Sequence, residues 1–242
     1  MNRFLESCYP SYYTTDYNLI FMIGNLMLVM PDKNCNLCPR LYELRQKNQE
    51  TYKNWHNAPV DSFGDIYGEM LIVGLAPGLR GANRTGRPFT GDWAGDLLYE
   101  TLNKYGFSTG IYSGESTDGL ILKNCRITNA VRCLPPANKP IRSEIKSCNN
   151  FLLQEISGMP HLKAIVALGL VAHNATLDAL RLRKAEYKFS HGSRFKLPTG
   201  LIFFSSYHCS RYNTNTKRLT PDMFYDIFKK VKAGLEPDPM NS

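Results

Sequence analysis

Residues able to do chemistry gather in three short segments of the 242-residue sequence. The first runs from Gly74 to Asp92, the second contains Asn129, and the third begins at His208. A carboxylate can stabilise positive charge or activate water, an amide can bind a polar edge, and an imidazole can donate a hydrogen bond. Together these residue types indicate a site that acts on a polar substrate.

The first segment is rich in glycine, with six glycines in residues 74–96. Glycine at this density favours a close approach of the backbone to a ligand, often a phosphate. Residues 81–88, GANRTGRP, have the glycine spacing of the nucleotide-binding loop GxxxxGK, but Arg87 replaces its lysine and Pro88 the hydroxyl residue that follows. The segment also lies beyond the expected strand end, and the dinucleotide pattern GxGxxG is absent. The sequence therefore argues against a nucleoside triphosphate site.

Phe89 and Asp92, at the far end of this segment, could serve a different ligand. Phe89 could stack on a flat ring, and Asp92 could act on a polar centre. The structural alternative places Phe89 in the core and uses Asp92 to cap a helix that begins near Trp93. Capping and catalysis are compatible, so both interpretations of Asp92 stay open.

The cysteines form a second candidate site. Cys35 and Cys38, in CNLC, have the CxxC spacing of a metal or cluster clamp, and Cys133 and Cys148 can supply two further thiolates. Four thiolates admit Zn²⁺ or a 4Fe–4S cluster, and spacing alone does not separate the two. Free buried cysteines are the structural alternative.

Composition indicates an ordinary soluble globular protein, with 43% hydrophobic and 21% charged residues. The net charge of +8 favours a polyanionic partner or a basic face. The apolar run 18–30 is too short to span a bilayer and does not resemble a signal peptide, so we expect it to pack on the core. We therefore expect a cytoplasmic protein without disulfides.

Strand and helix patterns alternate along the chain. Apolar runs predict strands over 69–76, 124–133, 163–169 and 200–208, and helical spacing predicts helices over 93–106, 143–157, 170–182 and 220–235. This alternation predicts a single α/β domain with a mainly parallel sheet covered on both faces. Ligands bind such sheets at the carboxyl ends of the strands, where the three chemical segments fall.

Four motifs together resemble a known family. They are CNLCPRL (35–41), GLAPGLRGANRTGRPFTGD (74–92), TNAVRC (128–133) and HCSRYNTNTKRLT (208–220). They closely resemble the iron–sulfur uracil-DNA glycosylases, nearest to the type b branch, also called family 5, known from prokaryotes. The resemblance covers about residues 35–230. It implies a domain over 31–236 with a central, mostly parallel four-stranded sheet flanked by helices, an N-terminal extension of unknown role (1–30) and a tail (237–242).

The same resemblance implies a monofunctional DNA-repair hydrolase. Such an enzyme flips uracil, and in this branch often hypoxanthine or other deaminated bases, out of DNA and hydrolyses the N-glycosidic bond to leave an abasic site. The expected partner is double- or single-stranded DNA containing deaminated bases. A monomer with no membrane partner is expected, in the cytoplasm and at the nucleoid when it acts.

Site residues also follow from the resemblance. Asp92 would polarise water or stabilise the cationic sugar, Asn129 would read the base edge or orient water, and His208 would donate to the uracil O2. The flipped base would stack on Phe89 and lie against the backbone around Gly74, Ala76 and Gly78. DNA would be contacted by Ser210, Arg211 and Asn213. A structural 4Fe–4S cluster would be held by Cys35, Cys38, Cys133 and Cys148.

Two positions qualify the resemblance. Leu75 and Ala76 are apolar where other branches carry an acidic or amide residue, a feature that the type b enzymes share and that implies a less polar pocket. Cys209 stands where the family usually has proline after the histidine, and losing the fixed φ of proline predicts a looser loop.

Two other functions stay open from the sequence. One is an iron–sulfur or zinc protein that binds nucleic acid without turnover; the other is an enzyme acting on free nucleosides. The trio Asp92, Asn129 and His208 favours catalysis, and the basic loop SRYNTNTKR favours a polymeric substrate.

Overall fold

A six-stranded sheet lies at the centre of the computed structural model, which describes residues 30–236. The strand order is β1-β5-β2-β6-β8-β7. The four inner strands run parallel, whereas β1 and β7 pair antiparallel at the two edges. The strand bounds are Phe63–Gly64 for β1, Met70–Gly74 for β2, Cys125–Asn129 for β5, Ala164–Leu168 for β6, Arg194–Lys196 for β7 and Ile202–Ser206 for β8.

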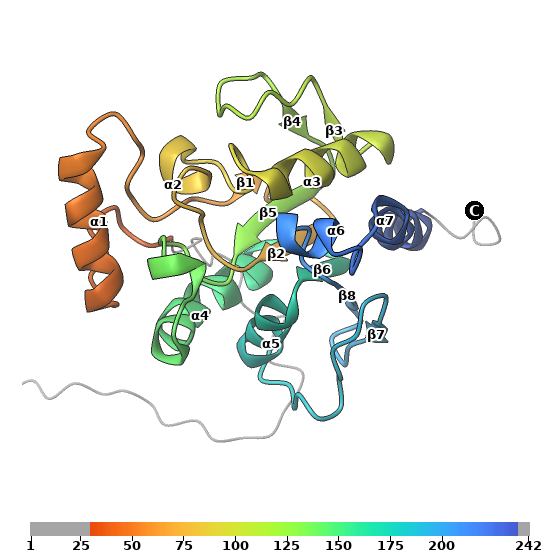
Figure 1. The fold of residues 1–242 in the computed structure, drawn as a ribbon. Coiled ribbons are helices and arrows are strands. Elements are labelled where there is room, and N and C mark those ends of the chain that lie inside the picture. Colours follow the sequence, from red (N-terminus) through yellow and green to blue (C-terminus); the bar gives the residue numbers. More distant parts are fainter. Residues whose placement is uncertain (1–29, 237–242) are drawn as a thin grey trace, which may run out of the picture.

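Helices cover both faces of this sheet (Figure 1). One apolar cluster joins the sheet to α3 (Trp93–Lys104) and α7 (Pro221–Leu235), and a second joins it to α4 (Arg142–Gly158) and α5 (Leu170–Ala179). Every residue of β2 and β6 is buried, as expected for parallel strands enclosed on two sides. The predicted α/β architecture is therefore confirmed.

Shorter elements complete the fold. They are α1 (Pro39–Thr51), α2 (Ala82–Thr85), the 3₁₀ turn η2 (Pro136–Asn138), α6 (Arg211–Asn215) and a two-stranded sheet of β3 (Ser108–Thr109) and β4 (Ile121–Leu122). Among residues 30–236 no helix is long and apolar enough to cross a bilayer. The predicted packing of the run 18–30 concerns residues that, apart from Met30, lie outside this range, and so does the tail. The domain bounds 31–236 stay a prediction.

The predicted four-stranded sheet is too small by two strands. All four predicted strands and all four predicted helices are present. The strands are shorter than predicted, whereas α4 extends one residue beyond its predicted bounds at each end. The two additional strands are the edges β1 and β7, of two and three residues. Both are partly exposed, so neither carries the apolar run by which the inner strands were predicted.

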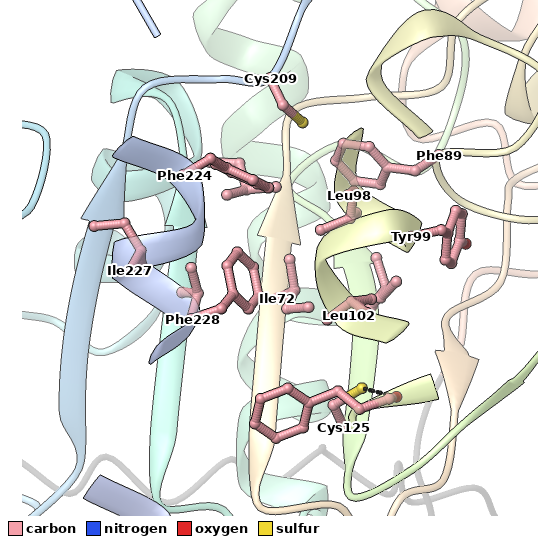
Figure 2. Packing of buried hydrophobic residues seen from close by; sticks show 14 of the residues in the cluster. Ile72, Phe89, Leu98, Tyr99, Leu102, Cys125, Cys209, Phe224, Ile227 and Phe228 are labelled. Atoms are coloured by element: carbon pink, nitrogen blue, oxygen red, sulfur yellow. Dashed lines mark hydrogen bonds between the residues drawn. The ribbon is translucent and has the colours of Figure 1, made fainter. Parts of the chain in front are cut away.

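Cys209 lies in the cluster beneath α3 and α7. Figure 2 shows Cys209 and Phe89 at one end of this cluster and Cys125 at the other. The Cys209 side chain is fully buried, and its thiol donates to the carbonyl oxygen of Ala94 at 3.4 Å. A proline has no such donor, so Cys209 anchors its segment to α3, and the predicted loosening is not supported.

Candidate active site and cysteine pocket

The three chemical segments meet at the carboxyl edge of the sheet. β2 ends at Gly74 and β5 at Asn129, and the parallel register places these two residues side by side. β8 ends at Ser206, two residues before His208. Since parallel strands present their carboxyl ends at one edge, the sheet itself assembles the predicted site residues.

The glycines of the first segment make room for the site's own side chains. A Cβ atom at Gly74 would clash with Oδ1 of Asn129 and would lie 2.6 Å from Cζ of Phe89. A Cβ atom at Gly81 would lie 2.5 Å from Oδ2 of Asp92, and one at Gly78 would lie 3.2 Å from it. These glycines, which lack side chains, therefore leave the space that the Phe89 ring, the Asn129 amide and the Asp92 carboxylate occupy.

Phe89 is held in a strained conformation. Its φ of 54° lies in the left-handed region, which costs a non-glycine residue about 1 kcal/mol. The Phe89 carbonyl accepts from the Tyr112 hydroxyl at 3.2 Å, and the Pro88 carbonyl accepts from the Tyr99 hydroxyl at 2.6 Å. The Phe89 ring is buried and lies 5.9 Å from the His208 ring, with 24° between their planes.

Arg87 holds the same loop from behind. Its buried guanidinium makes two hydrogen bonds of 2.7 Å to Asp118 and lies over the rings of Phe63, Tyr99 and Tyr112. Its hydrogen bonds hold the pKa of the Asp118 carboxyl well below its usual range. Arg87 is thus occupied by protein groups, which agrees with the argument against a phosphate loop.

Asp92 is the N-cap of α3. Its Oδ1 accepts from the Ala94 amide at 3.2 Å, so the predicted cap is confirmed. Burial raises the pKa of the Asp92 carboxyl, and the backbone hydrogen bonds at the cap offset this only in part. A buried carboxylate at a helix N-terminus is a fixed, poorly hydrated charge, which is what electrostatic catalysis requires.

His208 and Asn129 complete the polar lining. Burial lowers the pKa of His208 to about 4, so its imidazole is neutral near pH 7 and can donate one hydrogen bond. Asn129 is buried at the end of β5. The predicted residues Phe89, Asn129 and His208 therefore belong to one connected group.

The segment after His208 faces outward. Ser210 caps α6 by accepting from the Asn213 amide, and the Asn213 side chain donates to the His208 carbonyl at 2.8 Å. Arg211 is exposed, with its guanidinium 5.0 Å from the centre of the Trp93 ring. Tyr212 is 72% exposed. The sequence did not single out Trp93 or Tyr212, although aromatic residues among basic ones are a signal for nucleic-acid contact.

All four predicted cysteine ligands line one pocket. Cys35 and Cys38 precede or open α1, Cys133 follows β5, and Cys148 lies on α4; Leu41 and Phe151 also line this pocket. The six cysteines that the structure describes are all free, as expected. The other two lie in the core cluster beneath α3 and α7.

Arg45 points its charge into this pocket. It is buried, and it donates to the sulfur of Cys133 at 3.4 Å and to the carbonyl of Cys35 at 2.7 Å, while its Nε has no partner. Within residues 30–236 no three His, Cys, Asp or Glu side chains converge closely enough to hold a single metal ion.

The cysteine pocket adjoins the glycine-rich loop. The Ala130 amide donates to the Gly74 carbonyl, and the Val131 amide donates to the Leu75 carbonyl, each at 3.0 Å. Ala76 packs against the pocket's apolar cluster. Ala76 therefore lies between the glycine-rich loop and the cysteine pocket, and the role expected for its backbone in the wall around the base stays a prediction.

The family model described as the uracil DNA glycosylase superfamily matches residues 62–232. The chain belongs to this superfamily. It is 41% identical over 208 residues to the Type-5 uracil-DNA glycosylase of Thermus thermophilus, an alignment that covers 83% of this chain and 94% of that protein. The resemblance to the uracil-DNA glycosylases, nearest to family 5, is thereby confirmed.

Two further relatives carry the same name. The Type-5 uracil-DNA glycosylase of Pyrobaculum aerophilum is 37% identical, with 83% of this chain and 88% of that protein covered. The protein of this name from Mycobacterium bovis is 40% identical, with 84% of this chain and 79% of that protein covered. The roles of the individual site residues in this glycosylase family member stay predictions, which the proposal below develops.

Proposed function

We propose that this protein removes uracil from DNA by hydrolysing the bond between the base and its deoxyribose, leaving an abasic site. Membership of the superfamily and the shared name of the relatives support this activity. The observation that carries the assignment to residues is the meeting of the Phe89 ring, the His208 imidazole and the Asn129 amide at the carboxyl edge of the sheet.

The damaged base must first leave the DNA stack, because its glycosidic bond is inaccessible inside the duplex. In this proposal the flipped base stacks on Phe89 and lies against the backbone at Gly74, Ala76 and Gly78. The Asn129 amide hydrogen-bonds the polar edge of the base. The strained φ of Phe89, fixed by Tyr99 and Tyr112 through backbone carbonyls, keeps the ring in place before the substrate arrives.

Breaking the bond separates charge, with a cationic sugar on one side and an anionic base on the other. Neutral His208 donates to the uracil O2 as negative charge develops there. Asp92 stabilises the cationic sugar and polarises the attacking water. Burial raises the pKa of the Asp92 carboxyl. Excision should therefore slow as the pH falls through this raised pKa, because the protonated carboxyl carries no charge.

DNA itself is bound by the segment around α6. Ser210, Arg211 and Asn213 are the residues proposed for contact, with Arg211 supplying a charge for phosphate. Affinity for DNA then falls linearly with the logarithm of salt concentration, because bound phosphates release counterions. An enzyme of free nucleosides would show little salt dependence.

A 4Fe–4S cluster held by Cys35, Cys38, Cys133 and Cys148 fits the cysteine pocket. Buried Arg45 has no carboxylate partner among the described residues, and thiolates bound to a cluster would supply the missing negative charge. The cluster would tie α1, the end of β5 and α4 together and so support the neighbouring loop.

Zinc is the runner-up for this pocket. A single zinc ion needs four sulfurs at about 2.3 Å from one point. A larger centre with four iron atoms accepts ligands that are further apart. Metal analysis and the visible absorption of the purified protein decide between the two: iron with a brown colour supports the cluster, and a colourless zinc protein contradicts it.

Glycosylase activity is tested on matched DNA oligonucleotides that contain uracil, hypoxanthine or only normal bases, each single-stranded and double-stranded. After incubation, alkali cleaves the strand at abasic sites. Scission at uracil and none in normal DNA is the expected result. Binding without scission of any deaminated base would instead indicate the non-catalytic alternative. The monomeric state and the location at the nucleoid stay predictions.

A further inference from the structure

Two neighbouring residues of α6 are bonded to two different parts of the active site. The Asn213 side chain donates to the carbonyl of His208, at 2.8 Å. The Thr214 hydroxyl accepts from the indole Nε1 of Trp93, at 2.9 Å. Trp93 directly follows Asp92 and is the first residue of α3. The short helix α6 therefore bridges the segment that carries His208 and the helix start that carries Asp92.

Trp93 is unusual for a large apolar side chain, because it is 44% exposed at the surface. A purely structural tryptophan at a helix start would be expected to turn into the core, where the burial of its rings is favourable. Here the indole instead lies along α6, with its N–H bonded to Thr214 and the Arg211 guanidinium over its ring. These two contacts span 121 and 118 positions of sequence and both join α3 to α6.

We propose that Trp93 is a positioning residue, which through Thr214 fixes the Asp92 carboxylate relative to His208 and to the DNA-contacting face of α6. The inference rests on the proposed glycosylase function and adds a residue outside its reacting groups. Cys209 contributes a second link between the same elements, because its thiol is bonded to the Ala94 carbonyl beneath the surface contact.

Arg211 makes this link sensitive to DNA. A phosphate is a stronger partner for an exposed guanidinium than an aromatic ring is, because the phosphate carries a full charge and accepts hydrogen bonds in the plane of the guanidinium. Binding of DNA therefore draws Arg211 away from the Trp93 ring, while the bond from Trp93 to Thr214 keeps α6 attached to α3. The surroundings of the indole change although its position does not.

The kinetic test uses single-turnover excision from uracil-containing duplex by Trp93→Phe, Thr214→Val and the double variant. Phenylalanine keeps a ring for Arg211 but removes the donor. Valine removes the acceptor, together with the hydrogen bonds that the Thr214 hydroxyl donates to the carbonyls of Ser210 and Arg211. Each single variant is expected to lower the excision rate about fivefold, which corresponds to an activation free energy raised by about 1 kcal/mol. The dissociation constant for abasic-site duplex should change less than twofold. All three variants lack the hydrogen bond between Trp93 and Thr214. The double variant should therefore be no slower than the slower single variant.

Trp55→Phe is the matched control, since Trp55 stacks on Tyr52 outside this site, and its rate should equal that of the wild type. Rates of Trp93→Phe and Thr214→Val within twofold of the wild type would overturn the proposal. So would a double variant whose loss is the product of the two single losses. A loss of DNA affinity with an unchanged excision rate would also contradict it, because Trp93 would then act in binding alone.

A second measurement does not depend on turnover. The chain contains two tryptophans, so Trp55→Phe leaves Trp93 as the sole indole. Its emission should change saturably on titration with undamaged duplex, and the change should weaken with salt. No change in emission at saturating DNA overturns the link between Arg211 and Trp93. If the wild type excises no deaminated base, the glycosylase proposal fails, and this titration still decides whether Trp93 senses DNA.

Discussion

Two segments border the site and are held in opposite ways. The loop from Gly74 to Asp92 is fixed from behind by the buried pair of Arg87 and Asp118. The segment around α6 has only five helical residues and, apart from the buried thiol of Cys209, is tied down by contacts at or near the surface, such as the bond from Trp93 to Thr214. Buried polar networks are costly to break, whereas exposed hydrogen bonds contribute little.

The difference separates two tasks. Groups that stabilise developing charge must be in place before the reaction, because reorganisation during the reaction would cost part of their effect. In the proposed mechanism the loop supplies such a group with Asp92, and it also supplies the stacking ring of Phe89. The segment around α6, which we propose contacts DNA, must instead adapt to a flexible polymer, and the exposed side chains of Arg211 and Tyr212 have that freedom. The predictions that follow weaken one segment at a time.

The largest effect is expected from Arg87→Met, which leaves Asp118 as a buried charge without its partner. Loss of such a partner costs about 3 kcal/mol, which for a chain of this size lowers the melting temperature by roughly 10 °C. Thermal unfolding at pH 7 measures it. Arg84→Met is the control, because Arg84 pairs with the exposed carboxylate of Glu115 and should leave the melting temperature unchanged. Equal shifts of the melting temperature in the two variants would contradict the contrast between the buried pair of Arg87 and Asp118 and the exposed pair of Arg84 and Glu115.

An intermediate effect is expected from Cys35→Ser, which removes one proposed ligand from the pocket beside the loop. The brown colour of the bound cluster should disappear, and excision should slow by about tenfold, as for lost support around a metal site. Hydrogen exchange should speed up between Asn129 and Cys133, which join the pocket to the loop.

Cys125→Ser provides the matched control, since this buried cysteine lies in the core cluster of Figure 2 and does not line the cysteine pocket; its thiol donates to the Phe107 carbonyl. Its variant should keep the colour. Loss of colour in the Cys125 variant, or full colour in the Cys35 variant, would refute the ligand assignment.

The smallest effect is expected from Arg211→Met. Removing one phosphate contact should weaken DNA binding by several-fold and reduce the slope of log affinity against log salt by about 1. The melting temperature should stay within about 1 °C, because Arg211 is exposed. Binding isotherms at several salt concentrations measure the slope, and an unchanged slope would remove Arg211 from the DNA interface.

Much of the fold could be predicted because the inner strands are continuous apolar runs closed by turn residues. The two edge strands could not be predicted, because Phe63–Gly64 and Arg194–Lys196 are too short and too exposed to show an apolar pattern. Helix α1 was also not predicted, because its sequence PRLYELRQKNQET is polar on most faces and buries few residues. Its start after Cys38 depends on packing against the cysteine pocket rather than on periodicity.

The site shows the same division. The strand ends placed Asn129 and His208 at one edge of the sheet, because the carboxyl ends of parallel strands meet there. The roles of Asp92, Asn129 and His208 came from the family resemblance and stay predictions. The reason for glycine at positions 74 and 81 could not be predicted. These glycines make room for side chains that are distant in sequence or whose orientation the sequence does not reveal. The bond from Trp93 to Thr214 joins residues 121 positions apart, and only the folded chain brings them together.

In the proposed mechanism the buried Asp92 carboxylate serves the chemistry at a cost to the stability of the fold. Asp92→Asn tests it most directly, because asparagine is an equally good helix cap but carries no charge. Since the pKa of Asp92 is raised in the folded protein, its ionised form destabilises the fold above the ordinary pKa of about 4.

Asp92→Asn is expected to melt at a higher temperature than the wild type at pH 7, and this difference should disappear as the pH falls below about 4. At pH 7 the same variant should excise uracil roughly 1000-fold more slowly while it still binds DNA. Excision at the wild-type rate, or a melting temperature below that of the wild type at pH 7, would contradict the role proposed for the Asp92 carboxylate.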